Sequence, residues 1–180
     1  MLICFSGTLS VGKTTLINLL KLDDKFKNFK FIEDAARVAQ RNGFIINENG
    51  DSNTQEYIIE LTEQSAKLEN AILDGGSLDI LCYTLYLYKN NLVKFNHLKK
   101  SLKSFYNSIN QYNIIFFIEP EFNIFNDGVR SNSIEFQDII NKIFKYIIKK
   151  FNIKIYKLTG TVQDRLNQIF KQLNGELNNE

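Results

Sequence analysis

The residues with the clearest chemistry lie together near the amino terminus, in the segment Gly7-Thr8-Leu9-Ser10-Val11-Gly12-Lys13-Thr14-Thr15. The segment fits the phosphate-binding pattern G-x-x-x-x-G-K-[ST], in which glycines let backbone N–H groups turn toward phosphate oxygens. Lys13 can bring a mobile positive charge to the β and γ phosphates of a nucleotide, and the Thr14 hydroxyl can coordinate Mg²⁺. The sequence therefore predicts a site for ATP and Mg²⁺ contacted by Gly7, Thr8, Ser10, Val11, Gly12, Lys13, Thr14 and Thr15.

Carboxylates that follow two later apolar segments could complete this chemistry. Glu33 and Asp34 follow one such segment, and Asp74 follows the next. One carboxylate near a γ phosphate can hold Mg²⁺, which we assign to Asp74 together with Thr14. Another can accept a proton from an attacking hydroxyl. Because side chains alternate along a strand, only Glu33 or Asp34 should face the site, and the sequence leaves that choice open.

Arginine is used sparingly, with four arginines beside eighteen lysines. A planar guanidinium can grip a phosphate through two hydrogen bonds, so scarce arginines are candidates for phosphate contacts. Placement at random on the surface is the alternative for each of them. The four are Arg37, Arg41, Arg130 and Arg165, of which Arg41 lies one helical turn after Arg37 on the same expected face.

The pattern of the whole chain supplies the elements that would position these residues. Apolar segments at 2–5, 29–33, 71–74, 113–118 and 153–158 predict five strands. Helical spacing predicts helices after the phosphate-binding loop and at 34–40, about 53–68 (capped by Asn53 or Thr54), 77–88, 92–109, 133–150 and 162–173. The alternation of strands and helices predicts a doubly wound α/β fold, with about five parallel strands and helices on both faces of the sheet. We expect one domain that spans residues 1–180. The segment 119–132 is expected to be a loop, and 174–180 a frayed tail.

Composition narrows the function classes. A chain of 180 residues with 44% hydrophobic residues suits one domain with a full core. The net charge of +2 does not by itself favour nucleic acid or a membrane, and no segment is long and apolar enough to cross a bilayer. With no leader segment visible, we expect a cytoplasmic protein in which Cys4 and Cys82 are reduced core residues. The single histidine, His97, excludes a structural zinc site and is expected at the surface.

Two absences favour a kinase among the proteins that bind nucleotides. Asp74 is followed by Gly75 and Gly76, with no glutamate that could activate water as in motor and transporter ATPases. The guanine-reading pattern Asn-Lys-x-Asp is also missing from the sequence. The acceptor of the phosphoryl group is therefore expected to be a substrate hydroxyl or phosphate.

Four segments together resemble a known family. They are Gly7 to Thr15, Asp34-Ala35-Ala36-Arg37, Asp74-Gly75-Gly76-Ser77-Leu78-Asp79 with Tyr83, and Asp127-Gly128-Val129-Arg130. The chain resembles the small P-loop kinases of the ribosylnicotinamide kinase and deoxynucleoside kinase type. It is most similar to the AAA-labelled group of single-domain ATPases and kinases, often bacterial or from phages. The resemblance implies a P-loop nucleotide-kinase-like fold.

The resemblance also implies roles for single residues. Asp34 would activate the acceptor hydroxyl, with Glu33 as the neighbouring alternative, and Arg37 would approach the substrate or its phosphate. Arg130 would belong to a lid at 119–132 that closes over ATP. The expected catalytic residues are therefore Lys13, Asp34, Arg37 and Arg130. Thr159 and Gly160 would pack on the adenine. Thr161 could instead serve as a helix N-cap with Asp164.

One departure from the family keeps other functions open. The family usually has Asp-Arg or Glu-Arg where this chain has Asp74-Gly75, so a cation expected near the phosphates is missing. The first hypothesis is a kinase for a nucleoside or nucleotide; the second is an ATP-binding regulatory switch. A third, a kinase for nucleic-acid ends or modified bases, would need the lysines at 89, 94, 99, 100 and 103, which more often form a solvated helix face. The sequence leaves the acceptor and any homo-oligomer undefined.

Overall fold

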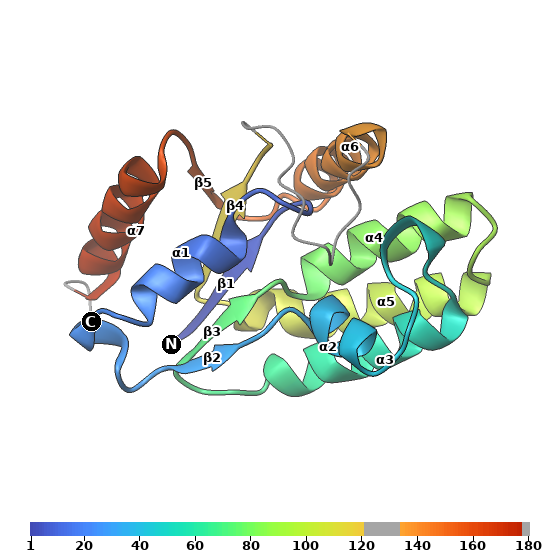
Figure 1. Cartoon of the computed structure of the whole chain (residues 1–180), viewed down its shortest axis with the longest axis horizontal. Coiled ribbons are helices and arrows are strands. Elements are labelled where there is room, and N and C mark those ends of the chain that lie inside the picture. The colour runs from blue at the N-terminus through green and yellow to red at the C-terminus, as the bar shows by residue number, and fades with distance from the viewer. Residues whose placement is uncertain (121–133, 178–180) are drawn as a thin grey trace.

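Five parallel strands form one sheet in the order β2-β3-β1-β4-β5 (Figure 1). This computed structural model describes residues 1–120 and 134–177. The strands are β1 (Leu2–Ser6), β2 (Lys30–Ile32), β3 (Ala71–Asp74), β4 (Ile114–Ile118) and β5 (Tyr156–Leu158). The predicted doubly wound parallel sheet is therefore confirmed, although β5 pairs with β4 over a shorter stretch than the expected 153–158.

Seven α-helices and three short 3₁₀ helices connect the strands in the described residues. The α-helices are α1 (Lys13–Leu20), α2 (Ala35–Arg41), α3 (Ser52–Ser65), α4 (Ser77–Lys89), α5 (Phe95–Ser108), α6 (Ile134–Lys150) and α7 (Val162–Leu177). The 3₁₀ helices are η1 (Asp24–Phe26), η2 (Asn47–Asn49) and η3 (Ile109–Gln111). The last α-helix continues past Leu173, the end that the sequence pattern predicted.

The two faces of the sheet carry different helices. In β1, Ile3 and Phe5 pack with residues of α1 and α7, whereas Leu2 and Cys4 face the opposite side. That second side is covered by α4, α5 and α6, and α3 packs against α4 and α5 (Figure 1). Because side chains alternate along a strand, the unbroken apolar sequence of β1 is buried on both faces.

The order of the strands places the site. The chain leaves β1 in one direction to reach β2 and later returns past β1 to reach β4. Right-handed crossovers therefore put the helices on opposite faces on the two sides of β1. Such a reversal opens a crevice at the carboxyl ends of the strands, here those of β1 and β3. The phosphate-binding loop follows β1, and Asp74 ends β3.

Two local predictions are wrong, and each has a structural reason. The N-cap of α3 is Asp51, whose side chain accepts a hydrogen bond from the backbone N–H of Thr54; the sequence pattern suggested Asn53 or Thr54. His97 is only 7% exposed, because it lies on the face of α5 that packs against α3.

The two cysteines are free and buried, as expected. Within the described part of the chain, every helix is too short or too polar to span a membrane.

Candidate active site

The phosphate-binding loop runs from the end of β1 to the first residue of α1, as the motif requires. Gly7 has a φ of 142°, and a Cβ atom there would lie 2.3 Å from the carbonyl oxygen of Ile118 in β4. The loop therefore lies so close to the neighbouring strand that only glycine fits at its start. Ser10 and Gly12 also have positive φ angles, 57° and 92°, which helps to curl the loop into a nest of N–H groups.

Lys13 places a positive charge inside this loop. Its side chain is buried, and Nζ donates hydrogen bonds to the carbonyl oxygens of Gly7 at 2.6 Å and Thr8 at 2.9 Å. A buried ammonium group is costly unless polar or anionic groups surround it. The arrangement therefore suits an anion, such as a phosphate, bound at the loop.

Two buried side chains from distant helices hold two further carbonyl groups of the loop. Gln137 in α6 donates from Nε2 to the carbonyl oxygen of Leu9 at 2.8 Å. Arg165 in α7 donates from Nη1 to the carbonyl oxygen of Val11, also at 2.8 Å. With these carbonyls engaged, the loop keeps its curvature. Sequence reasoning gave neither residue this role, and the scarce Arg165 contacts the loop backbone from a buried position.

Asp79 ties the loop to the start of α4. Its carboxylate accepts hydrogen bonds from Ser6 Oγ at 2.5 Å, from the Gly7 N–H at 3.2 Å and from the Gly76 N–H at 3.1 Å. Burial raises the pKa of Asp79 to about 6, against the opposing effects of the Lys13 charge and these hydrogen bonds. The sequence motif contained Asp79 but predicted no role for it. Its position three residues after Gly76, at the start of a helix, was the available signal.

Thr14 and Asp74 meet as predicted for a magnesium site. The Thr14 hydroxyl donates to Oδ2 of Asp74 at 2.5 Å. Hydroxyl and carboxylate oxygens are ligands that Mg²⁺ prefers, and Mg²⁺ in kinases usually takes few protein ligands beside phosphate and water. The donor set therefore fits Mg²⁺.

A cavity beside the loop brings four of the predicted residues together. Lys13 and Asp74 border it on the phosphate side, and Asp34 and Arg37 border it at the end of β2 and the start of α2. Its remaining wall comes from the chain before α3 and from α3 and α4. Residues of that wall include Ile46, Asn47, Gln55, Ile58, Thr62, Ser65, Asp79, Ile80 and Tyr83.

The two candidate carboxylates at the end of β2 differ in their partners. Asp34 is the N-cap of α2, and its Oδ1 accepts a hydrogen bond from the Ala36 N–H at 2.8 Å. Glu33 also borders the cavity, but Arg41 binds both of its carboxylate oxygens, one of them at 2.6 Å. The Arg41 hydrogen bond lowers the pKa of Glu33. Arg41 is therefore committed to Glu33 near the surface, and Arg37 is the arginine that borders the cavity.

Gly75, the departure from the family pattern, has a backbone reason. Its φ is 90°, in the left-handed region, and its N–H donates to the carbonyl oxygen of Phe5 at 2.9 Å. An arginine at this position would adopt a strained conformation. The glycine therefore follows from the local course of the chain after β3.

The predicted adenine contacts and the predicted lid are the two other parts of the expected site. Thr159 and Gly160 lie at the surface after β5, and Gln168 holds Thr159 through hydrogen bonds to its N–H at 3.1 Å and its carbonyl at 2.9 Å. Thr161 and Asp164 form the expected helix cap, with the Asp164 N–H donating to Thr161 Oγ1 at 3.2 Å. Arg130 and nearly all of the predicted lid at 119–132 lie outside the described residues.

Comparisons with known proteins agree with this arrangement. The family model of an AAA domain matches residues 2–165. No curated protein gives a significant match. Among solved structures, deoxyadenosine kinase from M. mycoides, bound to dCMP and dCDP, has a TM-score of 0.72 at 18% identity, with 97% of this chain and 99% of that chain covered.

Two further structures show the same fold. NadR in complex with NR has a TM-score of 0.71 at 16% identity and covers 94% of this chain, which spans 50% of NadR. Thymidylate kinase from Candida albicans has a TM-score of 0.64 at 17% identity, with 99% of this chain and 93% of that chain covered. At these identities the likeness establishes the fold, which is that of the small P-loop kinases.

Proposed function

The chain belongs to the AAA domain family, and from that premise we propose that it is a kinase that transfers the γ-phosphoryl group of ATP to a nucleoside or nucleotide. The observation that carries the proposal is the shared cavity. Lys13 and Asp74, which we assign to the phosphate and magnesium site, border the same cavity as Asp34 and Arg37. A site that only bound or hydrolysed ATP would not need a second set of polar side chains beside the γ phosphate.

The residues divide the reaction between them. The loop N–H groups and Lys13 bind the phosphates of ATP, and Thr14 with Asp74 would hold Mg²⁺. Bound Mg²⁺ would offset negative charge on the transferring group. Asp34 accepts the proton of the acceptor hydroxyl as that oxygen bonds to the γ phosphorus and ADP departs. Arg37 binds the acceptor or its phosphate.

Arg130 is proposed to act with the lid, on the family resemblance alone. In that role its guanidinium would close over ATP and stabilise charge during transfer. In the same way, Thr159 and Gly160 are proposed to pack on the adenine.

The acceptor is proposed to be a nucleoside or nucleotide because of the cavity wall and the structural neighbours. Gln55 and Tyr83 offer an amide and an aromatic ring, groups suited to the edge and the face of a planar base. The Thr84 hydroxyl holds Oε1 of Gln55 at 2.8 Å, so this amide is fixed in place. The neighbouring structures contain dCMP, dCDP and NR, which supports acceptors of this size.

The structure weakens the main argument for an ATP-binding switch. That alternative relied on the missing arginine after Asp74, and the positive φ of Gly75 explains why a glycine stands there. Arg37 borders the same cavity and can supply a cation. The lysines at 89, 94, 99, 100 and 103 are exposed, as expected for a solvated helix face.

A panel of acceptors tests the proposal. Purified protein with ATP and Mg²⁺ is given deoxynucleosides, nucleoside monophosphates or ribosylnicotinamide, and ADP formation and the phosphorylated product are measured. We expect one acceptor class to stimulate turnover, and Lys13→Ala to lower it at least about 100-fold, since one contact to the transition state is worth roughly 10²–10³ in rate. Circular dichroism of the variant should match the wild type. Tight ATP binding without stimulation by any acceptor would overturn the kinase assignment.

A further inference from the structure

Helix α3 forms one wall of the acceptor side of the cavity. Gln55, Ile58 and Thr62 line it from successive turns of the helix. Gln55 is only 4% exposed, and its amide position depends on where the first turns of α3 lie. What fixes those turns therefore determines the shape of this wall.

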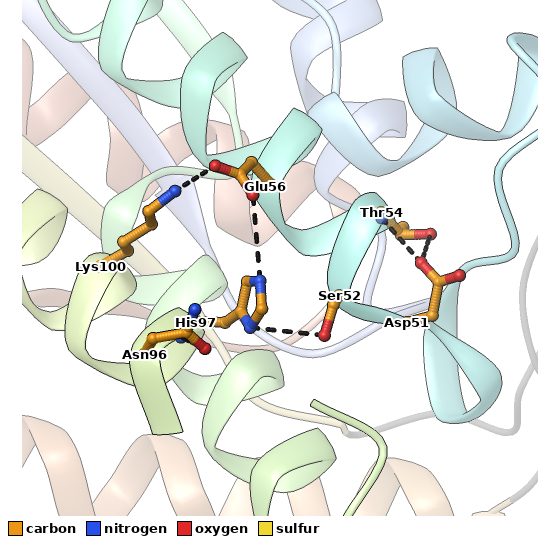
Figure 2. Close-up of polar contacts among 7 residues, drawn as sticks. All are labelled: Asp51, Ser52, Thr54, Glu56, Asn96, His97 and Lys100. Carbon is orange, nitrogen blue, oxygen red and sulfur yellow. Dashed lines mark hydrogen bonds and ion pairs between the residues drawn. The ribbon is translucent and has the colours of Figure 1, made fainter. Parts of the chain in front are cut away.

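A neighbouring face of α3, which carries Ser52 and Glu56, contacts His97 of α5 (Figure 2). His97 is 7% exposed, and its Nδ1 lies 3.3 Å from Oγ of Ser52, the first residue of α3. Its Nε2 lies 3.9 Å from Oε2 of Glu56. Glu56 also forms an ion pair with Lys100, which lies one helical turn after His97 in α5.

The His97 imidazole contacts α3 at two residues, Ser52 and Glu56, and can thereby hold the position of this helix. Ser52 and Glu56 are one helical turn apart, so a single rigid ring touches α3 at two successive levels. The Glu56–Lys100 pair is half exposed, and such pairs contribute little. We therefore expect the buried imidazole to hold these turns of the helix more firmly than the lysine does.

The first turns of α3 also form hydrogen bonds with the segment that precedes the helix. Asp51 caps the helix, and the Thr54 hydroxyl donates to the carbonyl oxygen of Ile45 at 2.9 Å (Figure 2 shows the cap). Ile46 and Asn47, the next residues, border the cavity. A shift of the first turns of α3 would therefore move both the Gln55 amide and this loop.

From this geometry we infer that His97 is a positioning residue for the acceptor pocket, acting through Ser52 and Glu56 on the first turns of α3. The inference rests on the proposed function, because it gives the pocket an acceptor to position. A helix with its side chains has a radius of about 5–6 Å, so a rotation of roughly 10° moves a side-chain end by about 1 Å. A displacement of that size in a reacting complex can cost on the order of 100-fold in rate.

Steady-state kinetics of His97→Ala test the inference, with Lys100→Ala as the matched control on the same helix. We expect kcat/KM for the acceptor to fall about 10–100-fold, with a loss in kcat, while the Kd for ATP stays within about twofold. Lys100→Ala should change neither value appreciably. His97→Asn, which can still reach Ser52, should recover part of the loss. A proportional loss of ATP and acceptor binding, or no loss at all, would show that His97 is only a core residue.

Hydrogen exchange separates this inference from the proposed function. In His97→Ala, backbone amides of 52–58 should exchange faster, while those of α1 and the phosphate-binding loop keep their protection. Unchanged protection of 52–58 would refute the positioning role whether or not the protein is active. If the wild type phosphorylates no acceptor but the exchange effect is present, the proposed function fails and the anchoring of α3 by His97 stands.

Discussion

Replacing Asp34 by asparagine separates the two roles that this residue would have. Its carboxylate caps α2 through the Ala36 N–H at 2.8 Å, and it borders the cavity beside Lys13 and Asp74. Asparagine is as good an N-cap as aspartate, so Asp34→Asn should keep the free energy of unfolding within about 0.5 kcal/mol. It cannot accept the proton of an acceptor hydroxyl, a contribution of roughly 10²–10⁴ in rate. At 1.36 kcal/mol for each factor of ten, the barrier should rise by about 3–5 kcal/mol.

Two further variants calibrate this experiment. Asp34→Ala loses the cap as well and should be about 1 kcal/mol less stable than Asp34→Asn, with similarly low turnover. Glu33→Gln removes the neighbouring carboxylate, which Arg41 holds near the surface, and should leave turnover nearly unchanged.

The assay combines three measurements on each variant. Initial rates with the best acceptor give kcat, calorimetry gives the Kd for ATP, and urea titration gives the free energy of unfolding. We expect kcat to fall in Asp34→Asn while the Kd for ATP stays close to the wild-type value. Turnover within about threefold of the wild type in Asp34→Asn would refute the assignment. A large loss in Glu33→Gln instead would transfer the role to Glu33.

The remaining predictions concern the loop and the buried carboxylate beneath it. Gly7→Ala puts a Cβ atom 2.3 Å from the Ile118 carbonyl at a φ of 142°, so urea unfolding should show a loss of roughly 2–5 kcal/mol. Gly43→Ala, at a φ of 85° with nothing within 4 Å, should lose only about 1–2 kcal/mol, and equal losses would contradict the steric argument. The raised pKa of Asp79, about 6 against 3.8, means that its contribution to stability is complete below pH 3.8 and is lost as the pH rises through 6. Relative to Asp79→Asn, the wild type should lose about 3 kcal/mol of unfolding free energy between those pH values, and a flat difference would show that Asp79 titrates normally.

The sequence alone predicted the parts of the site that depend on residues close together along the chain. The segment from Gly7 to Thr15 predicted the strand, loop and helix correctly, because each position of the motif meets a local backbone requirement. The meeting of Thr14 and Asp74 was also predictable, since both follow parallel strands whose carboxyl ends share one edge of the sheet. The apolar segments gave the five strands. Those of β1, β3 and β4 are buried on both faces, whereas the edge strands β2 and β5 are partly exposed.

Sequence alone did not predict which side chains support the loop, because their partners are far apart along the chain. Asp79 lies 72 residues from Gly7, Gln137 lies 128 from Leu9, and Arg165 lies 154 from Val11. No periodicity or motif encodes such distances. The packing of α4, α6 and α7 around the sheet brings these side chains to the loop.

The position of His97 shows the same limit at a single residue. The basic sequence around it predicted a solvated helix, and the lysines are indeed exposed. Whether one polar residue of that helix is exposed depends on which neighbour covers its face, and here α3 does. The sequence thus determined the phosphate chemistry and the order of the elements, because both follow from short-range backbone and burial requirements. The tertiary structure decided what holds the loop and what shapes the cavity beside it, because these depend on contacts between helices that the sequence does not place side by side.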